Sequence, residues 1–192
     1  YLDKEERESM VNRQMDFVIT QTQRLDFPLS NVVDNRIESG GYNDLDLSSL
    51  NHPVKSLFFG YSATSIDPTN DRFTFKNADI HINGTPLLEN MSPTYFHTCQ
   101  NYYKSKYGVI DFRVDTEDLM YTRYFVYHFG LNVSDYNPSG TCNFSRLDNA
   151  KLILRGVEKG NLRGDQKDIY VYATNYNVLR IKDGLAGILF GN

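Results

Sequence analysis

Histidine is the residue type in this chain best suited to metal chemistry. The four histidines are His52, His81, His97 and His128. Metal-dependent enzymes of the cupin type need two histidines two residues apart, a carboxylate shortly after and a third histidine on a later strand. The sequence has no His-x-His pair, and the nearest approach, His81 with Asn83 and Glu89, replaces one ligand by an amide in a turn. The spacing therefore predicts no metal site and no cofactor.

Cysteine is the other reactive residue type. Cys99 lies two residues after His97, so the two side chains would share a face of a strand, but no third group that would orient the histidine is identifiable. Cys99 and Cys142 are too few for a disulfide scaffold and lack the C-x-x-C spacing of a structural zinc site. We expect reduced thiols, and whether the two cysteines pair stays open. With no G-x-S-x-G elbow and no glycine-rich phosphate loop, we predict that the chain is not an enzyme.

Four triplets match the pattern for asparagine-linked glycosylation. They begin at Asn83, Asn90, Asn132 and Asn143. A proline follows the second triplet and weakens it, and without a secretory signal chance matches are the favoured explanation. Asn83 and Asn132 are kept as candidate glycosylation sites. Nearby tyrosines such as Tyr102, Tyr103 and Tyr107 could stack on sugars, although packing is the commoner use of aromatic side chains.

Composition narrows the class of protein. Of the 192 residues, 40% are hydrophobic and 14% aromatic, which is too much core-forming material for a disordered segment and favours strands. The net charge is −4 and the basic residues are scattered, so direct nucleic-acid binding is not expected. No apolar stretch approaches the roughly 20 residues that span a membrane, and no signal peptide is evident. Because the sequence starts at Tyr1 without a methionine, we expect a piece of a longer polypeptide.

The first half of the chain has both helical and strand signals. Asp3 and the acidic residues after it predict a short helix over the first dozen residues, and alternation begins near Gln14. Residues 34–53 are expected to form a long loop with little regular structure. Ser56–Thr64 and Phe73–Ile82 are predicted strands, and the Asn83-Gly84 pair after the second is a strong hairpin signal.

The second half is richer in strand signals. Residues 93–107 are ambiguous between a short helix and an aromatic loop. Predicted strands follow at Val109–Val114, Arg123–Leu131, Leu147–Arg155, Ile169–Ala173 and Asn177–Lys182. Arg123–Leu131 is apolar on nearly both faces, as is typical of a central strand. The pattern predicts an all-β fold, an eight-stranded antiparallel jelly-roll sandwich with long loops and a short N-terminal helix. Residues 1–14 would form the helix and residues 15–192 the domain.

Residues 138–149 are the least generic segment. They predict a Pro/Gly turn that leads into a compact corner. In that corner Ser145 would cap one helical turn, with Asp148 as its partner. Asn143 and Asn149 would tie down loop backbone. Nothing here indicates a reaction. The residues that define the segment are Pro138, Gly140, Cys142, Asn143, Phe144, Ser145, Arg146, Asp148 and Asn149.

This segment closely resembles a hallmark of the major capsid proteins of nucleocytoplasmic large DNA viruses, such as iridoviruses, phycodnaviruses and their amoebal relatives. The ending is also similar to that family, with Tyr172–Arg180 followed by the Gly-punctuated apolar tail Gly184–Phe190. The resemblance is sharp over residues 124–190 and loose over 1–123. Family members have two consecutive jelly rolls, and only one fits in this length.

The resemblance implies a structural role in a virus particle. Three copies would form a capsomer with a pseudo-hexagonal outline, and capsomers would tile an icosahedral shell. The implied partners are copies of the same protein, neighbouring capsomers and minor capsid proteins, with an inner membrane enclosed by the shell but not entered. The chain would be the C-terminal jelly roll, residues 1–14 its linker from an upstream one, and assembly would take place in the host cell, in the cytoplasm. Residues 34–53 and 83–107 are the candidate exposed insertions.

Three other classes compete with this interpretation. A carbohydrate- or receptor-binding jelly roll would use tyrosine-rich loops as its site and would show stabilisation by sugars. A cupin-type enzyme would bind a metal and is disfavoured by the missing ligand pair. A scaffold protein of the same lineage would form trimers but be absent from mature particles.

Overall fold

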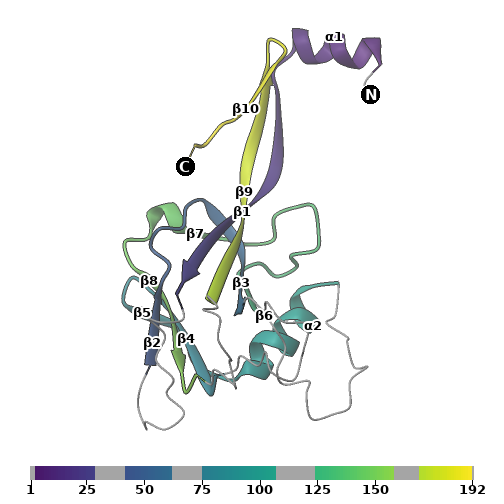
Figure 1. Cartoon of the computed structure of the whole chain (residues 1–192). Coiled ribbons are helices and arrows are strands. Elements are labelled where there is room, and N and C mark those ends of the chain that lie inside the picture. The colour runs from purple at the N-terminus through teal and green to yellow at the C-terminus, as the bar shows by residue number, and fades with distance from the viewer. Residues whose placement is uncertain (1–2, 29–41, 62–74, 107–123, 158–168, 192) are drawn as a thin grey trace.

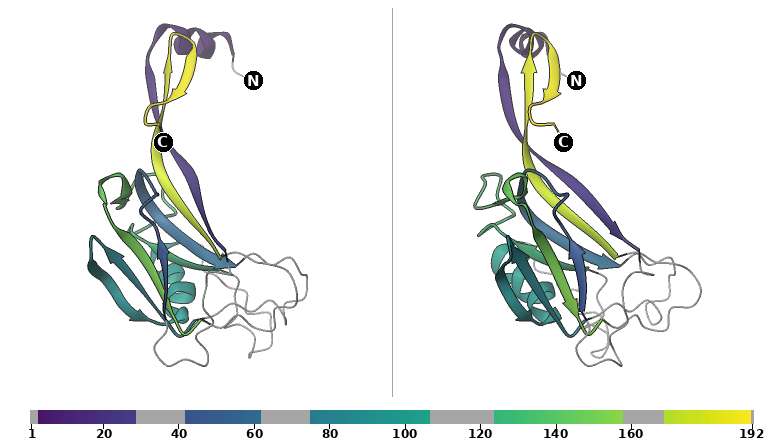
Figure 2. Two further views of the ribbon diagram at one scale, coloured as in Figure 1. Left: turned by 60° about the vertical axis from the view of Figure 1, so that its left-hand side comes forward. Right: turned by 90° about the vertical axis from the view of Figure 1, so that its left-hand side faces the viewer.

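A computed structural model describes residues 3–28, 42–61, 75–106, 124–157 and 169–191, and its strands form two antiparallel sheets that face each other (Figures 1 and 2). The sheets have the orders β1-β9-β3-β6 and β2-β8-β4-β5, with short strands β7 on β3 and β10 on β9. This order is that of a jelly roll, so the predicted all-β, eight-stranded antiparallel sandwich is confirmed. The strands are β1 (Met15–Phe27), β2 (Tyr42–Asp46), β3 (Pro53–Tyr61), β4 (Asn77–Ile82), β5 (Thr85–Met91), β6 (Tyr124–His128), β7 (Cys142–Asn143), β8 (Ala150–Arg155), β9 (Ile169–Lys182) and β10 (Leu185–Ile188).

The chain begins with a short helix, α1 (Lys4–Asn12), as the sequence predicts. The Asp3 side chain accepts from the backbone N–H of Glu6 (2.8 Å), and the Glu6 side chain accepts from that of Asp3 (3.1 Å). This reciprocal capping box satisfies two backbone donors that a helix start leaves open. None of the residues in α1 is buried, so tertiary burial contributes little to its stability.

Strands β1 and β9 pair over thirteen residues without a register shift, from Met15 opposite Ile181 to Phe27 opposite Ile169. Their lower part forms one side of the sandwich, and their upper part projects beyond it, with α1 at the tip (Figure 1). Because side chains alternate along a strand, the odd-numbered residues of both strands share one face. Within the sandwich this is the face of Leu25, Val171 and Ala173, which points to the core.

Asn83 and Gly84 form the tight turn of the β4–β5 hairpin, as predicted. Their φ angles are +50° and +77°, and a turn with two left-handed residues fits the natural twist of a hairpin. Asparagine and glycine are the residues that adopt this conformation at least cost, so the sequence signal has a direct structural cause.

Phenylalanine rings from both parts of the sandwich meet at the centre of the core. The ring centroids of Phe59 and Phe96 lie 5.4 Å apart, those of Phe59 and Phe125 5.5 Å, and those of Phe75 and Phe125 4.8 Å. All four side chains are at most 3% exposed. Edge-on and tilted pairs of this kind add to the free energy gained from area burial.

The expectation of a long irregular loop over residues 34–53 is wrong for its second half. Residues 42–46 form β2, which pairs with β8. Asn43, Leu45 and Leu47 are buried and alternate with the exposed Asp44 and Asp46. The alternation is present in the sequence, but the abundance of aspartate and asparagine there hides it.

Two predicted strands near the C-terminus are one. Ile169–Ala173 and Asn177–Lys182 are joined in β9, because the intervening Asn175 fits a buried polar layer instead of a turn. Among the described residues, β6 ends its sheet instead of lying centrally. The predicted strand Val109–Val114 lies outside the described residues.

The ambiguous segment 93–107 is helical where it is described. A π-helical turn, η2 (Tyr95–Cys99), leads into α2 (Gln100–Lys104). Phe96 is fully buried, and Gln100 and Asn101 are at least 94% buried, so the idea that 83–107 is wholly an exposed insertion is wrong. Gln100 Oε1 accepts from the backbone N–H of His128 at the edge of β6 (3.0 Å), which satisfies a donor that the sheet leaves open.

We predict that Phe59→Ala lowers the free energy of unfolding by about 3–5 kcal/mol, because the ring leaves a cavity between three others. Equilibrium denaturation measures this loss. The matched control is Tyr103→Ala, whose side chain is 78% exposed, with an expected change within about 0.5 kcal/mol. Equal losses in the two variants would contradict the assignment of the core.

Candidate functional site

The segment 138–149 forms a corner between the two sheets. Near its start Gly140, with φ +143°, passes Gly130, which lies at the start of the loop that follows β6. A Cβ on Gly140 would lie 3.3 Å from Cα of Gly130, and a Cβ on Gly130 would lie 2.9 Å from Oγ of Ser139. The backbones therefore approach more closely than side chains allow, which explains the glycines.

The middle of the corner clamps the start of β3. Asn143 caps a 3₁₀ turn, η4 (Phe144–Arg146), by accepting from the backbone N–H of Ser145. Phe144 is 2% exposed, and its backbone N–H donates to the carbonyl of His52 (3.0 Å). Ser145 Oγ accepts from the backbone N–H of His52 (2.8 Å). The predicted capping by Ser145 is therefore wrong, because its hydroxyl accepts a hydrogen bond from a residue 93 positions away in the sequence.

The end of the corner ties down the β4–β5 hairpin. Asn83 Oδ1 accepts from the backbone N–H groups of Asp148 (3.1 Å) and Asn149 (3.3 Å), and its own N–H donates to the carbonyl of Asn149 (2.6 Å). Pro138 and Arg146 are exposed. The segment thus links β3 of one sheet to the hairpin of the other and has an architectural role.

The two cysteines are free thiols, so no disulfide links Cys99 and Cys142 here. Burial raises the pKa of the Cys142 thiol, which keeps it protonated and unreactive. His97, the supposed base beside Cys99, lies with it in η2 rather than on a strand. The described residues contain no group of three histidine, cysteine or acidic side chains placed to hold a metal ion.

The candidate glycosylation sites both lie in turns. Asn132 Oδ1 accepts from the backbone N–H of Ser134 (3.1 Å), and its amide nitrogen donates to Asp135 (2.7 Å). Asn83 occupies the hairpin turn and is exposed. Modification of either side chain stays a prediction.

Buried amide side chains mark the point where the β1–β9 ladder leaves the sandwich. Asn175 is fully buried and Asn177 is 4% exposed. Gln23 donates to Oδ1 of Asn175 (3.0 Å) and to the carbonyl of Asn51 (2.6 Å), and it accepts from the backbone N–H of Asn51 (2.9 Å). Asn177 donates to Oε1 of Gln21 (2.8 Å). These five residues, here called the amide layer, satisfy one another and close the end of the core.

Beyond the amide layer, three strands continue as a projecting arm, made of residues 15–18, 178–182 and β10. Phe17, Leu179 and Ile188 lie side by side across its strands, and Met15, Ile181 and Ala186 form the adjacent row. These six residues, the arm face, are all apolar and lie on the side that points to the core within the sandwich. Phe17 is 44% exposed and Ile188 is 50% exposed.

The opposite side of the arm is mixed. Asp16 and Arg180 form a bidentate ion pair across the strands, with both contacts at 2.8 Å, and Arg180 lowers the pKa of the Asp16 carboxyl. Val18, next to this pair, is 62% exposed. The arm therefore has one apolar and one mixed face, which is the pattern of a sheet that is covered on one side.

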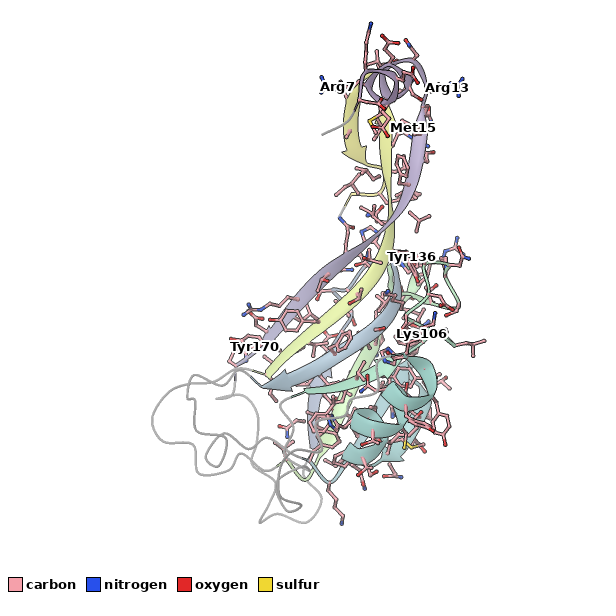
Figure 3. All side chains as sticks on the ribbon, turned by 90° about the vertical axis from the view of Figure 1, so that its right-hand side faces the viewer. Arg7, Arg13, Met15, Lys106, Tyr136 and Tyr170 are labelled. Atoms are coloured by element: carbon pink, nitrogen blue, oxygen red, sulfur yellow. The ribbon has the colours of Figure 1, made fainter. Side chains whose placement is uncertain are left out.

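A second exposed patch lies beside α2 (Figure 3). The loop after β6 meets the end of α2, where the backbone N–H of Val133 donates to the carbonyl of Lys104 (2.9 Å) and Lys106 pairs with Asp135 (2.6 Å). Large exposed side chains border this junction on α2 and on the loop. They are Tyr102, Tyr103, Leu131 and Tyr136. An exposed aromatic group of this kind is typical of contact surfaces.

His128 lies buried behind this patch. Its Nδ1 is 2.8 Å from Oγ of Ser56, and its Nε2 has no hydrogen-bond partner among the described residues. Burial, followed by repulsion from the ammonium groups of Lys104 and Lys55, lowers its pKa to about 4. The imidazole is therefore neutral at physiological pH.

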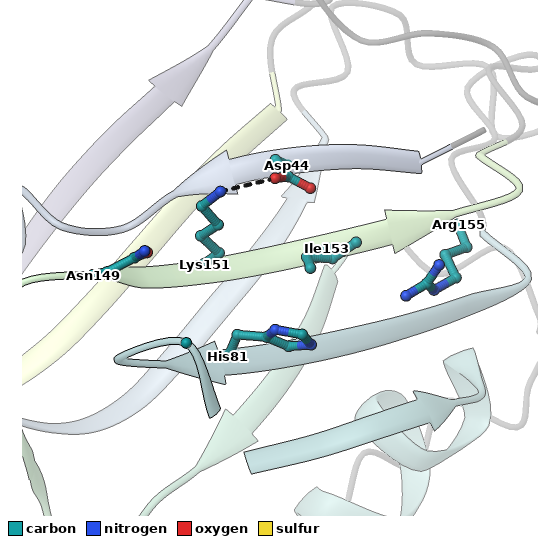
Figure 4. A pocket seen from close by; sticks show the side chains of 7 residues that line it. Asp44, His81, Asn149, Lys151, Ile153 and Arg155 are labelled. Atoms are coloured by element: carbon teal, nitrogen blue, oxygen red, sulfur yellow. Dashed lines mark hydrogen bonds and ion pairs between the residues drawn. The ribbon is translucent and has the colours of Figure 1, made fainter. Parts of the chain in front are cut away.

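A shallow pocket of about 370 Å³ lies on the outer side of the four-stranded sheet (Figure 4). Lys151 on its wall pairs with Asp44 (3.0 Å), and Arg155 pairs with the buried Asp79 (2.5 Å). His81 Nε2 is buried without a hydrogen-bond partner among the described residues. Since each cation has its own carboxylate, the pocket offers no net charge to a ligand.

Sequence comparison places the chain among known proteins. The profile of the family described as large eukaryotic DNA virus major capsid protein matches residues 6–187. The chain is 29% identical to the major capsid protein of Pyramimonas orientalis virus, over all of this chain and 47% of that protein. It is 31% identical to the major capsid protein of Paramecium bursaria Chlorella virus 1, over 60% of this chain and 28% of that protein.

Solved structures show the same fold. The capsid of PBCV-1, described as a quasi-atomic model, is similar over all of this chain and 55% of its own chain, with a TM-score of 0.76 at 23% identity. The Faustovirus major capsid protein matches with a TM-score of 0.54 at 14% identity. The chain therefore spans about half the length of the Pyramimonas orientalis virus protein and of the PBCV-1 chain, and a smaller part of the other two. In the described part of the chain, no helix is long and apolar enough to cross a membrane.

Sequence reasoning found the corner but missed the arm and the amide layer. Gln21 and Gln23, like Asn175 and Asn177, are spaced by two residues, and this spacing was the available signal that amides share one face. Their pairing across 152 residues of sequence is not visible in either segment alone.

We predict that Ser145→Ala lowers the free energy of unfolding by about 1–3 kcal/mol, because the backbone N–H of His52, a residue only 7% exposed, loses its acceptor. Thermal or chemical denaturation measures the change. Arg146→Ala is the control, with an exposed side chain and an expected change within about 0.5 kcal/mol. If both variants unfold like the parent protein, the hydrogen bond from His52 to Ser145 does not contribute to the stability of the fold.

We predict that acid destabilises the fold through His128. In the unfolded chain its pKa is near the ordinary 6.5, whereas in the fold it is about 4, so the unfolded state binds the proton first. The contribution is fully present above pH 6.5 and is lost as the pH falls toward 4, amounting to about 2–3 kcal/mol. Unfolding measured across this range should show a shallower slope for His128→Gln. Identical slopes would exclude His128 as the group responsible.

Proposed function

This chain belongs to the family of major capsid proteins of large eukaryotic DNA viruses, and from that premise we propose that it is the C-terminal jelly roll of a subunit that trimerises into capsomers. The chain is a structural capsid protein and a component of the virion. The observation that carries the proposal is the family match over residues 6–187, which includes the corner at 138–149.

The proposed subunit has two parts. Residues 15–192 make up the C-terminal jelly roll, and residues 1–14 link it to an upstream jelly roll. The length of two relatives supports this division, because the Pyramimonas orientalis virus protein and the PBCV-1 chain are each about twice as long as the part that the chain matches. Helix α1 supports it too, since it has its own capping box and no buried residue, as suits a connecting element.

Assembly proceeds by many modest contacts between repeated surfaces. Three subunits with two similar jelly rolls each give a capsomer of pseudo-hexagonal outline, and capsomers tile an icosahedral shell. The exposed patch around Tyr102 and Tyr136 supports such contacts, because tyrosine gives a large contact area with little loss of side-chain freedom. Multivalency then lets individually weak interfaces hold a shell together.

The proposed location is the outer shell of the particle, assembled in the host cytoplasm. Minor capsid proteins lie beneath it, and an inner membrane lies inside without being entered by this chain. Direct contact with nucleic acid is disfavoured by the net charge of −4 and the scattered basic residues. An enzymatic role is disfavoured because the family to which the chain belongs is one of capsid proteins.

We predict that purified particles contain this sequence within a polypeptide of roughly twice its 22.2 kDa, as the dominant protein. Intact-mass measurement and quantified copy number test this, and light scattering of gently released protein should give a trimer. A scarce 22.2 kDa monomer that is stabilised by sugars would instead support the receptor-binding class. A trimer that is absent from mature particles would indicate a scaffold.

A further inference from the structure

The arm face is an apolar surface that the described part of the sandwich does not cover. Within the sandwich, the same side of β1 and β9 packs against the second sheet. Above the amide layer the second sheet has ended, and the arm continues alone (Figure 2). Phe17, Leu179 and Ile188 therefore continue the core-facing side of the ladder above the amide layer, where Phe17 is 44% exposed and Ile188 is 50% exposed.

The arm is built to hold this face rigidly. The ladder between β1 and β9 has no bulge, and β10 adds a third strand in continuous register. The C-terminal segment is tied back where Leu189 N–H donates to the carbonyl of Val178 (2.8 Å) and Asn177 donates to that of Phe190 (2.8 Å). A preformed apolar surface binds a preformed partner without a large cost in ordering.

Its composition fits a permanent partner better than a transient one. The six residues of the arm face are apolar without exception, while the opposite side has the Asp16–Arg180 ion pair. Permanent interfaces resemble a domain core cut in half, whereas transient ones are about as polar as the rest of a surface. An apolar sheet that stayed open until assembly would also promote aggregation.

The position of α1 indicates which partner this is. The helix lies at the tip of the arm, and the amino end of the chain is there too (Figure 1). Val11 is close to the β9–β10 turn. Its Cγ2 lies 3.5 Å from the point that a Cβ on Gly184 would occupy. Polypeptide that precedes Lys4 must therefore leave from the arm, so an upstream half is delivered to this surface at high effective concentration.

We infer that the arm face is the docking surface for the upstream half of the same polypeptide, which covers Phe17, Leu179 and Ile188 in the folded subunit. This inference rests on the two-part subunit of the proposed function. It makes the arm the seam between the two halves of one subunit and leaves the mixed side of the arm outside that seam.

Site-specific photo-crosslinking in the full-length protein tests the inference. A benzophenone-bearing phenylalanine analogue replaces Phe17 in one variant and Val18, on the opposite side of the same strand, in the control. We expect the probe at position 17 to join peptides from the upstream half within one chain, with a yield at least tenfold above that at position 18. The intrachain product keeps the mass of a single chain.

Three results would overturn the inference. These are a product with the mass of two chains, a product joined only to peptides of residues 1–192, and equal yields at the two positions.

A second pair of variants tests the inference without the crosslinking probe. Ile188→Asp should speed amide hydrogen exchange in residues 15–19 of the full-length protein at least tenfold, whereas Leu185→Asp, at a 76% exposed position on the other face, should not. Equal exchange in the two variants would count against the seam.

These readouts are separate from those of the proposed function. Trimer mass and copy number in particles report on assembly, whereas the crosslink reports on which chain covers the arm. A trimeric, abundant protein with interchain crosslinks at position 17 would keep the capsid function and overturn the seam. A monomeric two-part protein with intrachain crosslinks would keep the seam and overturn the capsomer.

Discussion

The thirteen-residue ladder between β1 and β9 is the constraint on which the rest of the structure depends. It joins the beginning and the end of the described chain in one unbroken register. Because side chains alternate, that register fixes which residues face inward along the whole length, and a slip of one residue would turn every one of them outward. Core, amide layer and arm face are successive sections of the same inward side.

The amide layer allows this ladder to pass from a dry core to an open arm. Buried amides are costly when they lack partners, and those of Gln23 and Asn175 bind each other. The corner at residues 138–149 solves a similar problem at the junction of the sheets. Asn143 and Ser145 satisfy backbone groups there, and Asn83 does so from the neighbouring hairpin. In both places short polar side chains hold backbone segments that are far apart in sequence.

A shell protein needs surfaces rather than a reactive centre, and the exposed residues are arranged accordingly. Apolar side chains gather on one face of the arm, and tyrosines gather beside α2. The charged residues of the outer pocket are paired with each other, as with Lys151 and Asp44. In the proposed assembly, the apolar arm face forms the seam within a subunit and the amphipathic patch beside α2 forms the modest lateral contacts.

The sequence by itself determined the features whose causes are local. The capping box of Asp3 and Glu6, the Asn83-Gly84 turn and the alternation of β1 each depend on residues a few positions apart. The motif at 138–149 indicated the family for the same reason, since its residues are contiguous in the sequence. Only the tertiary structure decided that β2 forms among aspartates, that β9 runs unbroken through Asn175, and that Phe96 enters the core. Those outcomes depend on packing partners brought together from distant parts of the chain. Local secondary-structure propensities do not include such long-range contacts.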